Sequence, residues 1–296
     1  NRRPQDFYNA AAPAWGLDQM LRLLQSLDEQ QYLPRVLLLA IDPPWFNPNY
    51  EQQSFPEDLS DFANLFVVNR SFMQEVIEGV DLGRSGFEVA QYWQRSVLGS
   101  ESGLALGMRA IRDGHGFRSD GSEQYGDFLI AQWLWQPQQR DNHLRMMRDG
   151  LEMYAYGDKV DEEAMQTLRT IFDFAAEHQI TLIGFLPSYA PQLWDEMQQR
   201  GNHSYMHEVT TRTRALFDAY GFAFFDFSSG TWADTPDAEF YDGWHASELG
   251  NLRLYLRILQ ALPDVLGEYS DADVLEQIIA EASDPWQVFG LGSGAP

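Results

Sequence analysis

The sequence contains no cysteine and no apolar run of the length that crosses a membrane. Without cysteine the chain has no disulfide, no thiolate metal site and no cysteine nucleophile, although this absence does not identify a cellular compartment. No signal-like apolar segment opens the chain. Because the sequence begins at Asn1 rather than with Met, it is expected to be a processed or truncated product.

Basic residues are also scarce, with 20 Lys and Arg against 44 Asp and Glu, which gives a formal charge of −24. No basic patch stands out, so nucleic acid is disfavoured as a partner, and an anionic membrane surface is a poor fit. The chain has 296 residues, including 19 Phe, 13 Tyr and 9 Trp. This length and aromatic content predict a substantial buried core and argue against long disordered segments.

Continuous apolar runs predict strands that are covered on both faces. The clearest run is RVLLLAID at residues 35–42, which ends in an aspartate. Two similar runs are residues 180–187 and 223–229, and a weaker one is residues 6–13. Helical periodicity is found between and after these runs. It covers residues 16–30, 161–179, 206–221 and 247–262, and one more helix is expected within 271–290.

Alternation of strands and helices predicts an α/β fold with an open parallel sheet and right-handed crossovers. Residues 43–160 interrupt it and are rich in Pro, Gly, Asn, Gln and Trp, so we expect a long, mainly helical insertion there. Helices are predicted at residues 60–79 and 88–99 within it. The sequence thus predicts one domain over residues 1–285, with an insertion at about 43–160, and a flexible tail at 286–296.

The stretch FYDGWHASELG places Asp242 and His245 three residues apart, just before a predicted helix. In such a pair the histidine can accept a serine proton, while the aspartate fixes the imidazole tautomer and stabilises the imidazolium. Parallel α/β sheets place functional residues at the carboxyl ends of their strands. The spacing alone also fits a helix-capping aspartate beside a surface histidine.

This stretch resembles the last motif of the SGNH/GDSL hydrolase superfamily, a D-x-x-H on the loop before the final helix. The chain is most similar to the extracytoplasmic branch that includes alginate O-acetyltransferase-like proteins and the D-alanine transfer protein. Three stretches match the branch in order. They are FYNAAAPAWGLDQML, PRVLLLAIDPPWFNP and GFLPSYAPQLWDEM. The resemblance covers residues 5–50 and 160–262, and it implies a flavodoxin-like three-layer sandwich around a parallel sheet.

The resemblance implies that His245 is the general base and Asp242 its orienting carboxylate. The family serine follows the first strand in a G-[DS]-S block, which is absent before FYNAAAP, so the nucleophile is expected upstream of Asn1. Oxyanion and support roles fall to Asn9, Gly16 and Asp42, and the residues expected to contact substrate are Ser188, Tyr189 and Trp244. Asn9 could equally satisfy its own turn, and Asp42 could cap the loop ahead of Pro43.

Two serines within the chain are alternative nucleophiles. Ser102 is the central residue of GSESG, but the residues before it have helical character rather than the strand that a nucleophile elbow needs. Ser188 directly follows the predicted strand at 180–187, where the order of motifs in the family makes it a residue of the site wall rather than the nucleophile. His203 and His207 have i, i+4 spacing without a third ligand, so solvated positions are expected rather than a metal site. Several aromatic residues could either stack against sugar rings or pack in the core, and core packing is favoured. These are Trp45, Tyr92, Trp93, Trp133 and Trp135.

The resemblance thus predicts an esterase or O-acyltransferase that acts on acyl groups of a cell-surface polysaccharide. The ligand would be an acylated glycan or a small acyl ester, and no cofactor is implied, because an acyl-enzyme route needs none. It also implies a periplasmic or extracellular protein, membrane-anchored through an N-terminal segment, with a membrane acyl-transfer protein as partner. The alternative is a catalytically inactive relative that binds glycan or a protein partner.

Overall fold

A computed structural model describes residues 7–10, 16–50, 116–117, 123–124, 137–229, 235–286 and 288. The chain divides into two compact units, the first comprising residues 1–51 and 133–288 and the second residues 52–132 and 289–296. In the second unit, β2 (Gly116–Phe117) pairs antiparallel with β3 (Glu123–Gln124). The helices predicted at 60–79 and 88–99, and Ser102, lie outside the described residues.

The first unit is mixed α/β, mostly helical, and contains a small parallel sheet of three strands in the order β1-β4-β5. The strands are β1 (Val36–Ala40), β4 (Thr181–Leu186) and β5 (Ala223–Asp226). Three predicted strands are thereby confirmed. The fourth, at residues 6–13, is not: residues 7–10 lie outside any strand, and its other residues are outside the described part.

Five helices match their predictions to within two residues where helix bounds were predicted. They are α1 (Leu17–Glu29), α7 (Glu162–Glu177), α9 (Tyr205–Tyr220), α10 (Glu248–Ala261) and α12 (Ala272–Glu281). Local chemistry sets several ends. The Asp161 carboxylate accepts the amides of Glu163 and Ala164 at the start of α7, and Ser247 accepts the amide of Gly250 at the start of α10.

The sequence did not predict three further helices or three single turns of 3₁₀ helix. The helices are α6 (Pro137–Asp149), α8 (Pro191–Arg200) and α11 (Pro263–Leu266), and the turns are η2 (Pro43–Phe46), η3 (Glu152–Tyr154) and η5 (Asp237–Glu239). Proline opens four of the six, because its fixed φ suits the first helical position. Although η2, α6 and η3 fall in the stretch expected to be an insertion, they belong to the first unit.

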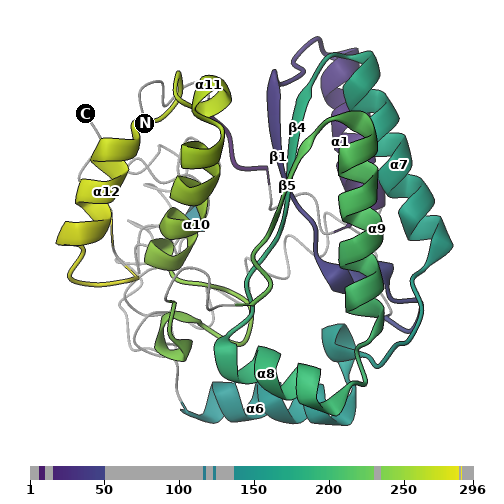
Figure 1. Ribbon diagram of the computed structural model, residues 1–296, viewed down its shortest axis with the longest axis vertical. Coiled ribbons are helices and arrows are strands. Elements are labelled where there is room, and N and C mark those ends of the chain that lie inside the picture. Colours follow the sequence, from purple (N-terminus) through teal and green to yellow (C-terminus); the bar gives the residue numbers. More distant parts are fainter. Residues whose placement is uncertain are drawn as a thin grey trace, which may run out of the picture. The chain divides into compact units, whose positions relative to one another are not determined.

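Helices cover both faces of the sheet, with α1, α7 and α9 on one face and α10 and α12 on the other (Figure 1). Successive residues of β1 point to opposite faces. Leu37 and Leu39 pack in the cluster with α1 and α7, and Val36 and Leu38 pack in the cluster with α10. Both faces therefore need apolar side chains, which explains why the strand reads as a continuous apolar run.

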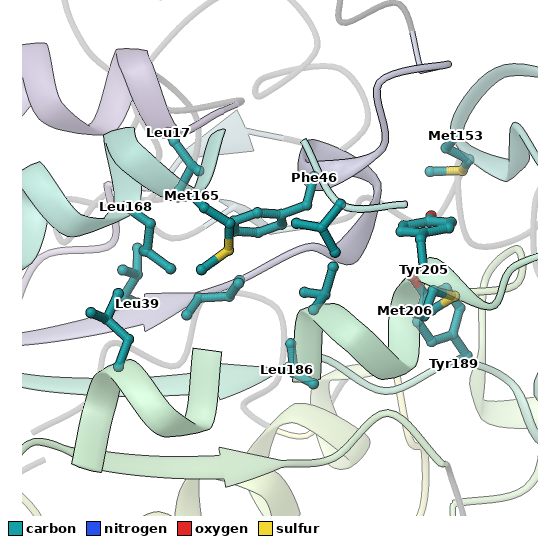
Figure 2. Packing of buried hydrophobic residues seen from close by; sticks show 14 of the residues in the cluster. Leu17, Leu39, Phe46, Met153, Met165, Leu168, Leu186, Tyr189, Tyr205 and Met206 are labelled. Atoms are coloured by element: carbon teal, nitrogen blue, oxygen red, sulfur yellow. The ribbon is translucent and has the colours of Figure 1, made fainter. Parts of the chain in front are cut away.

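Side chains from α1, β1, α7, β4 and α9 meet in the larger core (Figure 2). Phe172 of α7 and Phe217 of α9 form an edge-to-face pair with ring centroids 4.6 Å apart. The ring of Phe217 lies directly over Gly184 of β4, where a Cβ atom would be only 1.9 Å from Cζ of Phe217. The absence of a side chain at Gly184 therefore lets α9 pack closely on the sheet.

Within the described residues, β1 hydrogen-bonds to β4 alone, so its outer edge carries no further strand. Four of its five residues are only half-buried, although all are apolar. A strand with this composition is typical of the interior of a parallel sheet. The outer edge of β1 therefore has the character of a pairing site for another strand.

We predict that Gly184→Ala lowers the free energy of unfolding by about 1–3 kcal/mol, because the new methyl group overlaps Phe217. Urea denaturation measures this change. Phe217→Leu in the same chain should recover part of the loss, since it removes the atoms that clash. Simple additivity of the two substitutions would contradict close packing at this position.

Candidate active site

The Asp242 carboxylate organises the loop between η5 and α10. Its Oδ1 accepts the amides of Gly243 at 2.8 Å, Trp244 at 3.0 Å and His245 at 2.9 Å. The residue is only 6% exposed. Burial alone would raise the pKa of Asp242, but the hydrogen bonds from His245 and from the amides outweigh it and hold the pKa below its usual value. Asp242 is therefore a fixed, ionised carboxylate.

The second oxygen of Asp242 is bound to His245. Nδ1 of His245 lies 2.6 Å from Oδ2 of Asp242, and Nε1 of Trp244 donates to the same oxygen at 3.2 Å. The His245 side chain is 54% exposed, whereas its carboxylate partner is buried. With Nδ1–H donated to the carboxylate, the lone pair of the neutral imidazole is on Nε2, the atom that can accept a proton. The predicted acid–base pair is thus assembled in the structure.

Packing and backbone hydrogen bonds hold this loop in place. The carbonyl of Gly243 accepts the amide of Ala190 at 2.8 Å, which joins the loop to the segment after β4. A Cβ atom at Gly243 would lie 2.6 Å from Cδ2 of Leu193 and 2.9 Å from the hydroxyl of Tyr154. Glycine is therefore needed between the two site residues, because Leu193 and Tyr154 occupy the space of a side chain.

Ser188 and Tyr189, predicted to contact substrate, lie between β4 and α8 and directly precede Ala190. The structure thus brings this segment next to the loop of Asp242 and His245. Both side chains are buried, and the Tyr189 ring stacks on Trp194 at 5.7 Å. Trp244 is partly buried, with its ring edge-to-face against His245 at 4.9 Å. Contact of these residues with substrate stays a prediction.

Asp42 follows β1 and is partly buried. It occupies the N-cap position of η2, but its side chain makes no capping hydrogen bond; its backbone carbonyl accepts the amide of Trp45 instead. Burial raises the pKa of Asp42 to about 6, while the charge of His245 opposes the shift. The Asp42 side chain therefore does not fill the capping role, and a support role for Asp42 at the site stays a prediction.

Asn9 and Gly16, predicted to assist as oxyanion donors, precede or begin α1. Gly16 is the buried N-cap residue of α1, and its carbonyl accepts the amide of Met20 at 3.0 Å. Asn9 is half-buried in a stretch without regular structure. Donation from either residue to an oxyanion stays a prediction.

Two residues at this site were not predicted from the sequence. Nδ1 of His143, on α6, lies 3.0 Å from the hydroxyl of Tyr154, on η3. That hydroxyl packs against Gly243, and the charges of Asp242 and His245 both act on His143. No motif or periodicity marks either residue, because the contact joins two short elements within a stretch expected to be an insertion.

The expectation that His203 is solvated was wrong, whereas His207 is exposed as expected. His203 is 3% exposed, and its Nε2 lies 2.9 Å from the carbonyl oxygen of Tyr154. It precedes α9 in a turn, so the i, i+4 spacing does not place the two histidines on one helical face. Burial lowers the pKa of His203 despite this backbone hydrogen bond.

Of the aromatic residues considered for sugar stacking, Trp45 is partly buried and packs against the larger core. The others lie outside the described residues. No helix in the described ranges is both long and apolar enough to cross a membrane. Comparison of the chain with family models, curated proteins and solved structures found no match.

We predict that Asp42→Asn stabilises the protein at pH 8. The pKa of Asp42 is about 6 in the folded state and about 3.9 in an unfolded chain, so its charge opposes folding above pH 6. The variant should gain about 1–3 kcal/mol at pH 8, and the gain should shrink as the pH falls through 6 toward 4. Urea denaturation at both ends of this range measures it.

Asp218→Asn is the matched control, because Asp218 is an exposed aspartate on α9. Its effect should stay near zero at both pH values. A stabilisation by Asp42→Asn that is equal at pH 8 and pH 4.5 would contradict the assignment of the effect to ionisation.

Proposed function

We propose that the protein performs acyl transfer through a serine nucleophile, with His245 and Asp242 as the acid–base half of the site. The observation that carries the proposal is the short contact between Nδ1 of His245 and Oδ2 of Asp242. A surface histidine beside a capping aspartate would not require a buried carboxylate whose second oxygen is bound to an imidazole and an indole. The exposed imidazole can reach an external substrate.

Within that class, we propose an SGNH-type esterase or O-acyltransferase that acts on acyl groups of a cell-surface polysaccharide. The flavodoxin-like form of the fold belongs to this proposal, as does a periplasmic or extracellular location beside a membrane acyl-transfer partner. Support comes from the order β1, β4, β5 in a parallel sheet and from the Asp–His loop that immediately precedes α10. Both features accompany the sequence stretches that resemble the superfamily.

The chemistry follows from the roles of the two side chains. The serine oxygen attacks the ester carbonyl, and Nε2 of His245 takes its proton while Asp242 stabilises the imidazolium. The same proton then passes to the departing sugar oxygen as the C–O bond breaks, which leaves an acyl-enzyme. Water completes hydrolysis by the reverse steps, and a second sugar hydroxyl would complete transfer. Neither outcome needs a cofactor.

Within the described residues, the outer edge of β1 has no partner strand, and this suggests where the serine belongs. A strand paired parallel to this edge would end near Asp42, which lies two residues after β1 and interacts electrostatically with His245. Functional groups of parallel sheets gather at this carboxyl edge. We therefore place the nucleophile at the end of a strand that pairs with β1.

Labelling of the full-length protein with a fluorophosphonate probe tests this function. We expect covalent labelling of one serine, and a loss of roughly 10³-fold or more in the labelling rate for His245→Ala, because the serine loses its base. Asp242→Asn should also slow labelling strongly, since the imidazole is no longer held in the right tautomer. Hydrolysis of 4-nitrophenyl acetate should follow the same order.

His207→Ala provides the control, because His207 is an exposed histidine of α9. It should label at the wild-type rate, and the thermal unfolding midpoint of each variant shows that the fold is intact. Mass spectrometry then identifies the modified serine. Labelling of Ser102 or Ser188 would overturn the placement of the nucleophile. A labelling rate that is the same in His245→Ala as in the wild type would favour the non-catalytic binding protein instead.

A further inference from the structure

The hydrogen bond between His143 and Tyr154 fixes the tautomer of His143. Tyr154 is 1% exposed, and within the described residues its hydroxyl meets no other hydrogen-bond partner than Nδ1 of His143. A buried hydroxyl that donated to nothing would lose a hydrogen bond, so the Tyr154 proton belongs on this contact. Nδ1 of His143 is then the acceptor, and the ring carries its own proton on Nε2.

This arrangement keeps His143 neutral. Protonation of Nδ1 would break the bond from Tyr154, and burial lowers the pKa of His143 although Asp242 and Glu152 act in the opposite direction. Nε2–H is consequently a neutral donor. The His143 side chain is only partly buried, and Nε2 makes no hydrogen bond within the part of the chain that the structure describes.

The donor lies beside the acid–base pair rather than in a separate region. The Tyr154 hydroxyl contacts His143 on one side and packs against Gly243, between Asp242 and His245, on the other. The carbonyl of Tyr154 is held independently by His203. Tyr154 is therefore held at both its carbonyl and its hydroxyl, and the hydroxyl links His143 to the loop of His245.

The charges around this donor restrict what it can bind. Within the described residues, the charged groups that act on His143 are Asp242, His245 and Glu152, and those that act on Tyr154 are Asp242 and Glu152. Asp42 interacts with His245 at the same site. Carboxylates thus predominate among the described charged groups at this site, and these carboxylates would repel an anionic ligand.

We propose that His143 binds the glycan substrate through Nε2–H, as a donor to an uncharged oxygen, and that Tyr154 positions it by fixing its tautomer. The substrate is accordingly an acyl ester of a neutral sugar rather than of a uronic acid or a phosphorylated sugar. This inference rests on the proposed function, since it concerns the same site. A neutral imidazole suits an ester carbonyl, a ring oxygen or a hydroxyl, because each accepts one hydrogen bond.

The binding role is tested by steady-state kinetics on the full-length protein. The substrates are an acetylated glucomannan oligosaccharide, which is neutral, and an acetylated oligogalacturonate, which is anionic. We expect His143→Leu to raise KM for the glucomannan ester about threefold to tenfold and to leave kcat within about twofold, as for loss of one neutral hydrogen bond. His143→Gln should retain most of the affinity, because its amide can donate from nearly the same place.

The tautomer is tested by NMR of the six histidines, labelled with ¹⁵N in the imidazole ring. Wild-type His143 should show the Nε2–H form, and addition of the glucomannan oligosaccharide should shift its Nε2 signal. Tyr154→Phe should lose the preference for this tautomer. His207→Gln, on the exposed face of α9, should change neither KM nor the His143 signals.

Three results would overturn the inference: an unchanged KM in folded His143→Leu, an Nδ1–H tautomer in the wild type, or a preference for the galacturonate ester. If His143→Leu does not fold, the KM of His143→Gln and the NMR titration of the wild-type protein still test whether His143 binds the glycan. Hydrolysis that survives His245→Ala would instead defeat the proposed function. The titration at His143 reports on glycan binding even in that event, so the two failures are distinguishable.

Discussion

The candidate site depends on one buried negative charge. Asp242 is almost fully removed from water, and a carboxylate in that position is tolerable only when its lone pairs are satisfied. Three consecutive amides, an indole and an imidazole supply those hydrogen bonds. The loop must wrap around the carboxylate to do so, and this wrapping is what orients His245. Removal of the charge would therefore disturb the shape of the loop as well as its chemistry.

The segments that follow the strands are hydrogen-bonded to other segments of the candidate site. Asn47, after η2, donates to the carbonyl of Ala155 at 2.7 Å and so joins the exit of β1 to the stretch that carries Tyr154. The amide of Ala190 joins the exit of β4 to Gly243. The segments that follow β1 and β4 are thus each hydrogen-bonded to a neighbouring segment of the candidate site.

The sequence predicted those elements and side-chain pairs whose pattern lies within a short stretch of the chain. Strand β1 is recognisable because both of its faces are covered, helix α7 because its apolar residues repeat, and the acid–base pair because its partners are three residues apart. His143 and the burial of His203 were not predictable in this way. The bond of His203 goes to a backbone carbonyl 49 residues away, and no side-chain pattern encodes such a partner. Proline-opened α6 and α8 were also missed, because both are mostly polar and have few apolar residues to mark a buried helical face.

The two halves of the site also differ in how they form during folding. Asp242 and His245 close a turn of only three residues, so the chain loses little entropy when they meet. The contact of Tyr154 with Gly243 joins parts of the chain that are 89 residues apart. The acid–base pair can therefore assemble early, within a local turn, whereas the donor on His143 becomes aligned only after long-range closure. The two parts of the candidate site would thus form at separate stages of folding.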